Sequence, residues 1–310
     1  MQKSQTLRLG TRSSNLALTQ SRMIAKMLQR AHPGLQVELV DISTVGDKVT
    51  DKPLKSFGGV GVFVKELEAA LLSGHVDIAV HSLKDMPTRQ PKGLLLGAIV
   101  GREDTRDVLF ARNGQRLEDF SAGSVIGSGS TRRRAQLKSR FPNLEFAEIR
   151  GNVETRLRKV REGEFAATIL ARAGLKRLGL LEPSMQVLAL AWMLPAPGQG
   201  AIGVECRAGD RRARRILSAI HNAGVAACVA AERSILEALG GGCHLPLGAL
   251  GTIRAKTLRL QAVFGLPDGS KIVRAEGSAA PKEARALGKR VAKELLAQGG
   301  KEVLSALDQE

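Results

Sequence analysis

Short apolar runs alternate with segments that carry an apolar stripe at helical spacing along the first eighty residues. Residues 7–10 and 37–42 predict strands, and Ser13 or Ser14 can cap a helix between them. A glycine-rich stretch at 58–61 precedes a second helix and the apolar run 77–80. The two predicted stripes are Leu16, Met23, Ile24, Met27 and Leu28, then Phe63, Leu67, Ala70 and Leu71. This order predicts a parallel sheet with right-handed crossovers.

A second unit of the same kind is predicted between residues 107 and 194. Its helices are expected to begin near Thr131 and Asn152, and its strands are expected at 108–110, 125–126, 146–149 and 168–170. The strand-like run 202–206 follows a loop rich in Pro and Gly, and we expect it to return to the first unit. Two segments of the chain would then cross between the domains.

The pattern changes in the last ninety residues. A helix is predicted over 225–239, and an alternating strand at 258–264 leads into a turn at 267–269. A final helix over 281–298 has proline in its first turn and Gly299 after its end. The prediction is therefore α/β with a small C-terminal α+β domain. Domain 1 comprises 1–102 and 200–220, domain 2 comprises 103–199, and domain 3 comprises 221–310.

The net charge restricts the possible partners more than the overall composition does. The 310 residues contain 47 Lys and Arg against 30 Asp and Glu, a formal charge of +17. Such a chain favours nucleic acid, an anionic membrane or a small substrate with several negative charges as its partner. The longest uncharged apolar run, 187–194, is too short to span a bilayer, and the N-terminus lacks the apolar core of a signal peptide. A cytoplasmic location is expected.

Polar residues gather where predicted strands end, which is where open α/β sheets place ligands. The run 77–80 is followed by His81, Ser82, Lys84 and Asp85, a cluster that is either a solvated turn or part of a site. Further strand–helix junctions rich in Ser, Arg and Lys occur at 10–14, 127–134, 150–156 and 176–177. Guanidinium groups suit carboxylate or phosphate oxygens. Together these junctions favour a ligand with many carboxylates over nucleic acid, since no recognition helix or aromatic stacking platform is recognisable.

The three cysteines argue against a disulfide framework and against a structural zinc site, because no CxxC spacing occurs. Cys206 and Cys228 lie in apolar surroundings and are predicted to be core residues. Cys243 follows three glycines and must lie on a loop. It is either a small buried loop residue or, beside His244, an activated thiol that serves as nucleophile or attachment point.

In this order, the motifs closely resemble the porphobilinogen deaminase family, whose members are also called hydroxymethylbilane synthases. The resemblance covers nearly the whole chain. It rests on Thr11-Arg12-x-Ser14 and on residues 61–68, 77–87, 102–107, 130–133, 150–152, 175–179, 198–200 and 241–243. It implies a three-domain transferase whose first two domains resemble doubly wound periplasmic-type binding proteins.

The resemblance also implies an activity in porphyrin, tetrapyrrole and haem biosynthesis. Four molecules of porphobilinogen are condensed with release of ammonia, and the linear tetrapyrrole hydroxymethylbilane is hydrolysed off. One covalent dipyrromethane per chain acts as primer, and its thioether maps onto Cys243. Asp85 matches the catalytic aspartate. The residues expected to bind primer and substrate carboxylates are Arg12, Ser14, Ser82, Lys84, Ser128, Ser130, Arg132, Arg133, Arg150, Arg156 and Arg177.

Some positions depart from the family pattern. Asn15 stands where proline is common, and Val45, Ser56 and Val60 replace residues that are often basic, so the binding role of the glycine-rich loop is open. We expect a monomer with no metal, no nucleic acid and no membrane partner, and a structural role for His81. Two alternatives remain at this point: a non-catalytic anion-binding module of the periplasmic type, and a nucleic-acid-binding protein whose affinity would fall steeply with salt.

Overall fold

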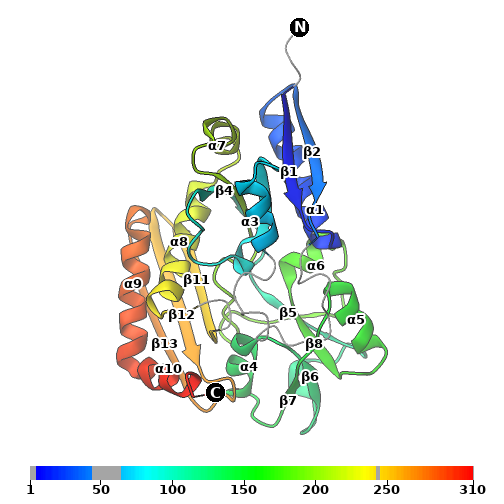
Figure 1. The fold of residues 1–310 in the computed structure, drawn as a ribbon. Coiled ribbons are helices and arrows are strands. Elements are labelled where there is room, and N and C mark those ends of the chain that lie inside the picture. The colour runs from blue at the N-terminus through cyan, green and yellow to red at the C-terminus, as the bar shows by residue number, and fades with distance from the viewer. Residues whose placement is uncertain (1–4, 44–63, 242–244, 310) are drawn as a thin grey trace. The chain divides into compact units, whose positions relative to one another are not determined.

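The computed structural model describes residues 5–43, 64–241 and 245–309 (Figure 1). The chain divides into two compact units, each described here by itself. Unit 1 comprises Met1–Glu103 and Gly200–Ala226, and unit 2 comprises Asp104–Gln199 and Ala227–Glu310. Within the described ranges, no helix is both long enough and apolar enough to cross a membrane.

Unit 1 is built on a five-stranded sheet in the order β2-β1-β3-β10-β4. β1 is parallel to β2 and β3, whereas β10 is antiparallel to both of its neighbours. The predicted return of residues 202–206 to the first unit is confirmed. Sequence analysis did not identify β4. The strands are β1 (Gln5–Thr11), β2 (Leu35–Asp41), β3 (Ile78–Ser82), β4 (Leu94–Arg102) and β10 (Ala201–Arg207).

Helices cover both faces of this sheet. α1 (Asn15–Ala31) and α7 (Arg211–Ser218) share one core with β1, β3 and β10, and α3 (Lys65–Leu72) packs on the other side against Ala79. The predicted stripe of α1 is wrong at Met23, which is 39% exposed. The helix instead turns two polar residues inward, and one of them, Ser21, donates to the Thr11 hydroxyl at 2.7 Å.

The first sheet of unit 2 has the order β7-β6-β8-β5-β9, with β6 parallel to β7 and β8 and β5 antiparallel to its neighbours. The helices begin where the pattern predicts them. Strands are β5 (Asp107–Ala111), β6 (Val125–Gly127), β7 (Glu145–Ala147), β8 (Ala167–Ala171) and β9 (Gln186–Val187); helices are α4 (Thr131–Lys138), α5 (Val153–Arg161) and α6 (Arg172–Leu178).

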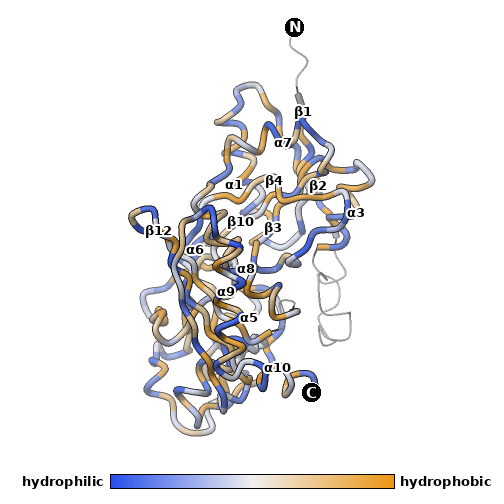
Figure 2. Tube along the Cα trace, turned by 90° about the vertical axis from the view of Figure 1, so that its left-hand side faces the viewer, coloured by the Kyte–Doolittle hydropathy of each residue, from blue (hydrophilic) through white to orange (hydrophobic). Residues whose placement is uncertain are grey.

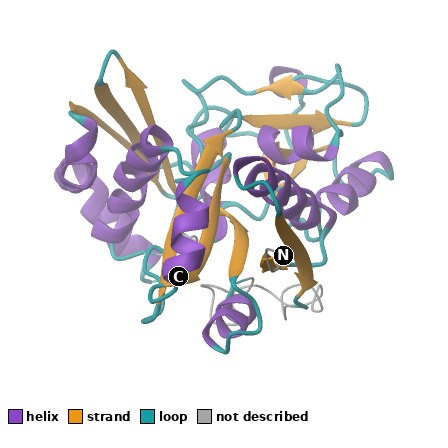
Figure 3. Cartoon of the chain, turned by 90° about the horizontal axis from the view of Figure 1, so that it is seen from above, coloured by secondary structure: helices purple, strands orange, loops and turns teal. Residues whose placement is uncertain are grey.

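A three-stranded antiparallel sheet, β11-β12-β13, with its own apolar core forms the rest of unit 2 (Figures 1 and 3). β12 alternates between exposed and buried residues in its first half, and α9 buries Leu287, Val291 and Leu295 at helical spacing; Figure 2 colours these segments by hydropathy. The helix predicted over 281–298 is confirmed: a 3₁₀ turn at Pro281–Glu283 leads into α9, and the chain stays helical until Gly299, where φ is 108°. The elements are β11 (Leu247–Arg254), β12 (Thr257–Gly265), β13 (Ile272–Ala279), α8 (Ala223–Ala238), α9 (Ala284–Leu295) and α10 (Lys301–Leu307).

These sheets and helices confirm the predicted class, mixed α/β with a small C-terminal α+β part. Sequence analysis also missed β11 and α7. The short helix α7 contains four arginines, so its apolar face is carried by only a few residues, among them Ala213, Ile216 and Leu217.

Candidate active site

The end of β3 holds Lys84 and Asp85 in a short 3₁₀ turn, Leu83–Asp85. Pro87 disfavours helix at Met86, which is extended at φ −84° and ψ 140°. Leu83 and Met86 are buried on either side of Lys84 and Asp85, so the turn is anchored by its apolar residues. The Asp85 carboxylate is exposed. A rigid turn with an exposed carboxylate can present that group to a ligand.

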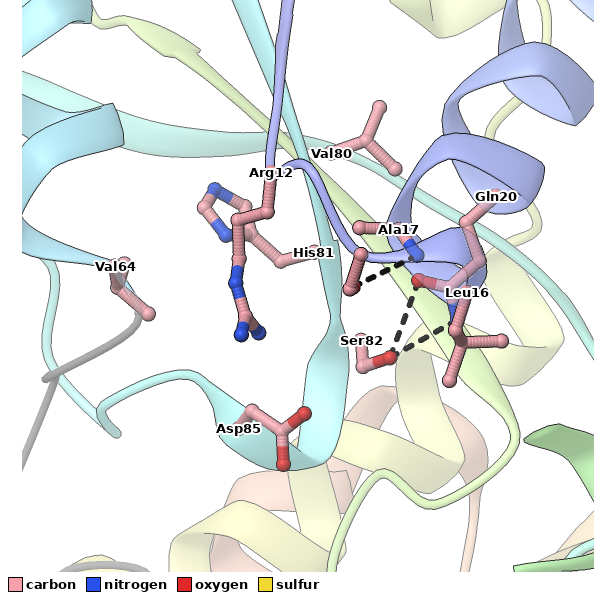
Figure 4. Close-up of a pocket in the computed structure, with 10 residues that line it drawn as sticks. Arg12, Leu16, Ala17, Gln20, Val64, Val80, His81, Ser82 and Asp85 are labelled. Carbon is pink, nitrogen blue, oxygen red and sulfur yellow. Dashed lines mark hydrogen bonds between the residues drawn. The ribbon is translucent and has the colours of Figure 1, made fainter. Parts of the chain in front are cut away.

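A pocket in unit 1 opens beside this turn (Figure 4). The side chains of Arg12 and Asp85 both point into it, from the segment after β1 and from the turn after β3. Ser14 caps α1, and its Oγ accepts from the Ala17 N–H at 3.4 Å. The lining residues are Arg12, Ser14, Leu16, Ala17, Gln20, Val64, Val80, His81, Ser82 and Asp85.

Ser82 lies in this pocket, but its hydroxyl already has a protein partner. The Gln20 Nε2 lies 2.9 Å from the Ser82 Oγ as a donor, and the Gln20 Oε1 lies 3.2 Å from it as an acceptor. Gln20 is only 3% exposed. Sequence reasoning missed this residue; the available signal was a polar side chain four positions before Ile24 on the buried stripe. Gln20 fixes the orientation of Ser82 in the pocket wall.

His81 is buried, at 5% exposure. Its Nε2 lies 3.4 Å from Oε2 of Glu205, which is fully buried on β10. Glu68, on α3, is close enough for both charges to act on it. Burial raises the pKa of the Glu68 carboxyl, the charge of Glu205 raises it further, and His81 lowers it. Sequence analysis identified neither glutamate.

In unit 2, two serines shape the loop between β6 and α4. Ser128 is 3% exposed, and its Oγ accepts from the Ser130 N–H at 3.3 Å. Ser130 caps α4, accepting from the Arg133 N–H at 3.4 Å. The N-terminus of a helix of this kind attracts anions through its N–H groups and dipole.

Arg132 and Arg133 turn inward and hold Asp107, which is 0% exposed at the start of β5. The Arg132 Nη1 donates to Asp107 Oδ2 at 2.8 Å and to the Leu194 carbonyl at 2.8 Å. The Arg133 Nη2 donates to Asp107 Oδ1 at 2.8 Å. Burial alone would raise the pKa of Asp107, but the charges and hydrogen bonds of the two arginines hold it well below its usual value.

The remaining predicted anion-binding residues of unit 2 lie on three segments. The Arg150 Nη2 is 2.7 Å from Glu148 Oε1, and the Arg156 Nε donates to the Gly151 carbonyl at 2.9 Å. Gly151 has φ +104°, a conformation that L side chains rarely adopt. Arg177 lies in the last turn of α6. Their ligand contacts, and those of Lys84 in unit 1, stay predictions.

Cys243 lies outside the described residues, as do Val45, Ser56 and Val60. Cys206 and Cys228 are both buried, at 0% and 7% exposure, which confirms that they are core residues. Burial raises the pKa of the Cys206 thiol to about 11, so this group is an unreactive thiol at neutral pH.

Comparison with known proteins assigns the whole chain. The model of the "Porphobilinogen deaminase, dipyromethane cofactor binding domain" matches residues 7–215, and that of the "Porphobilinogen deaminase, C-terminal domain" matches residues 226–297. The chain belongs to the porphobilinogen deaminase family. A porphobilinogen deaminase of Syntrophotalea carbinolica is 45% identical over 305 residues, 98% of this chain and 97% of that protein.

Membership of the porphobilinogen deaminase family confirms the resemblance seen in the motifs. It also confirms the predictions of a transferase, of hydroxymethylbilane synthase activity in tetrapyrrole biosynthesis, and of a dipyrromethane cofactor.

Solved structures of other proteins are similar at low sequence identity. The LysR family transcriptional regulator CbnR gives a TM-score of 0.44 at 11% identity, covering 70% of this chain and 69% of that chain. The probable amino-acid ABC transporter extracellular-binding protein ytmK from Bacillus subtilis gives 0.41 at 13% identity, covering 70% and 90%.

Proposed function

We propose that this porphobilinogen deaminase joins four porphobilinogen molecules with Asp85 as the carboxylate that stabilises developing positive charge. The observation that carries the proposal is the exposed Asp85 side chain, which shares a pocket with Arg12 at the end of a buried strand. The pair combines an anion for the reacting ring with a cation for its carboxylate substituents.

The chemistry explains why a carboxylate is needed. The bond between the aminomethyl carbon of porphobilinogen and its nitrogen breaks, and ammonia leaves. The electron-poor carbon then accepts electrons from a pyrrole α-carbon, a carbon–carbon bond forms, and the α-carbon loses its proton. Positive charge develops on pyrrole nitrogen, where a nearby carboxylate lowers the barrier by electrostatic stabilisation and can relay the proton.

Acetate and propionate substituents require cations, and the chain supplies donors in both units. In unit 1 these are Arg12, Ser14 and Lys84, with Ser82 held by Gln20. In unit 2 they are Ser128, Ser130, Arg150, Arg156 and Arg177. Arg132 and Arg133 both bind Asp107. Because each guanidinium has five N–H donors, we propose that both arginines also bind ligand carboxylates.

Dipyrromethane suits this donor set. The Nε of Arg133 and the Nε of Arg134 are buried and have no hydrogen-bond partner among the described residues. Buried guanidinium N–H groups of this kind favour a carboxylate. When attached, dipyrromethane supplies a pyrrole with a free α-carbon. We propose Cys243 as the attachment residue.

We also propose a cytoplasmic monomer with three domains. The first sheet of unit 2 and the C-terminal sheet have separate apolar cores, which supports treating residues 221–310 as a domain of their own.

The mass of the intact protein tests the attachment. We expect the purified protein to exceed its sequence mass by two linked pyrroles, and Cys243→Ser to show no excess. Cys228→Ala is the matched control: it also removes one thiol, but from the core, and should keep the excess. Wild-type protein that turns over porphobilinogen without any covalent excess would contradict the attachment.

A further inference from the structure

Three ionisable side chains meet between α3 and the sheet of unit 1. They are Glu68 from α3, His81 from β3 and Glu205 from β10, and they are 8%, 5% and 0% exposed. In the antiparallel pair of β3 and β10, Glu205 lies opposite Ala79 and Gly203 opposite His81. Directly opposed residues point to the same face, so both side chains lie on the α3 side with Ala79.

The hydrogen-bonding capacity of this cluster is largely unused. Both Glu205 oxygens, Glu68 Oε1 and His81 Nε2 are buried without a hydrogen-bond partner among the described residues. His81 Nε2 and Glu205 Oε2 are 3.4 Å apart, which is an ion-pair distance without hydrogen-bond geometry. By contrast, Asp107 in unit 2 is bonded to two guanidinium groups.

The charge balance of the cluster depends on protons. Two ionised carboxylates side by side would bury two like charges, which is unfavourable because burial removes the water that stabilises each ion. A proton held by the cluster relieves this cost. The raised pKa of Glu68, which burial and the charge of Glu205 cause, agrees with a proton held in this way.

His81 connects the cluster to the pocket. Its side chain lines the pocket with Arg12 and Asp85, and Figure 4 shows the imidazole beside the Arg12 side chain. The charged and titratable groups around His81 are Glu205 from β10, Glu68 and, through Glu68, Lys65 from α3, Arg12 after β1, and Asp85 after β3.

We propose that Glu68, His81 and Glu205 form a buried proton-holding cluster that sets the charge of the pocket wall and so positions a ligand with its carboxylate at Arg12 and its pyrrole ring at Asp85. His81 is the positioning residue: it transfers no proton to the substrate and acts through the field and the shape of the wall. This inference rests on the proposed function, because the positioned ligand is porphobilinogen.

The test compares pH profiles of kcat and KM for turnover of porphobilinogen. Variants are His81→Gln, Glu205→Gln and their double combination, and Glu38→Gln is a matched control because Glu38 is an exposed carboxylate of the same unit. We expect each single variant to lose up to about a hundredfold in kcat, because a small misplacement of the bound substrate costs up to about that factor. The pH profile should lose one ionisation, and the double variant should lose little more than a single one.

Superimposable pH profiles of wild type and His81→Gln would overturn the positioning role, and so would losses that multiply in the double variant. The unfolding curve of each variant shows whether it folds. If one single variant does not fold, the pH profile of the other single variant tests the positioning role. A wild-type protein that does not consume porphobilinogen would refute the proposed function instead. The proposal that the cluster holds a proton can be tested without an activity assay. Glu68→Gln must change the pH dependence of the unfolding free energy.

Discussion

Asp85 and Asp107 put the same chemistry, an aspartate near arginine, to opposite uses. Asp85 is exposed on a turn and lines a pocket with Arg12. Asp107 is fully buried and is held by Arg132 and Arg133. In the first region the two side chains line a pocket, whereas in the second the charges pair with each other inside the core. A motif that combines arginine and aspartate at a strand end therefore says nothing about its use until burial is known.

Burial also decides what each group contributes to stability. An exposed ion pair contributes only about 0–1 kcal/mol. Removing one partner of a buried pair costs about 3–5 kcal/mol, because the other charge stays behind without compensation. We therefore expect substitutions at Asp85 to affect turnover, and those at Asp107 to affect the fold.

The largest effect is expected for Asp85→Ala. Loss of the carboxylate should lower turnover of porphobilinogen by about 10²–10⁴-fold, the range for a charge-stabilising or proton-relaying group. The unfolding free energy should change by less than about 0.5 kcal/mol, because the side chain is exposed. Ammonia release and urea unfolding measure the two quantities. Turnover close to that of wild type would remove Asp85 from the mechanism.

Asp107→Asn should lower the unfolding free energy by about 3–5 kcal/mol at pH 7. Because the pKa of Asp107 is lowered in the folded protein, the ionised carboxylate stabilises the fold. This stabilisation is present above pH 3.8, the usual pKa, and is lost as the pH falls below that value. Urea unfolding at pH 7 and at lower pH measures this. Asp104→Asn is the control, since Asp104 pairs with Arg106 and Arg172 at 18% exposure and should cost less. Equal costs would invalidate the contrast based on burial.

Arg12→Gln and Arg132→Gln compare the two cations directly. Arg12→Gln should raise the KM for porphobilinogen about ten- to a hundredfold, the equivalent of about 1.5–3 kcal/mol for a hydrogen bond to a charged group. Arg132→Gln should act mainly on stability, because Arg132 is 5% exposed and bonded to Asp107. Steady-state kinetics together with thermal unfolding separate the two. If Arg132→Gln unfolds like wild type, the ion pair between Arg132 and Asp107 contributes little to stability.

Glu68→Gln extends the comparison to a buried carboxylate that has no bonded cation among the described residues, and it should have the smallest effect. The raised pKa means that ionised Glu68 destabilises the folded protein, so its contribution is present at low pH and is lost as the pH rises above 4.5. The variant should gain stability relative to wild type as the pH rises from 5 to 8. Chemical unfolding across this range is the measurement. A constant difference between the two proteins would show that Glu68 is ionised throughout.

The local sequence pattern was sufficient to predict much of the fold and part of the candidate site. The strands before the polar junctions, the caps Ser14, Ser130 and Asn152, and the buried cysteines follow from nearby sequence. The inward direction of Arg132 does not, because its partner lies 25 residues earlier in the chain. The link between Gln20 and Ser82 joins residues 62 positions apart. Contacts of this kind depend on how the sheet assembles, which hydrophobic periodicity does not encode.

The place of β10 between β3 and β4 has a consequence for how the protein is made. The chain must complete residues 104–199 before β10 can enter the sheet of unit 1. Closing so long a loop is entropically costly and slows folding. During synthesis the first hundred residues would wait on the ribosome with an unpaired strand edge, a species prone to aggregation. Pulse-labelled hydrogen exchange during refolding should find the amides of β10 protected later than those of β1 and β2, which makes the entry of β10 into the sheet a late step in the maturation of every new molecule.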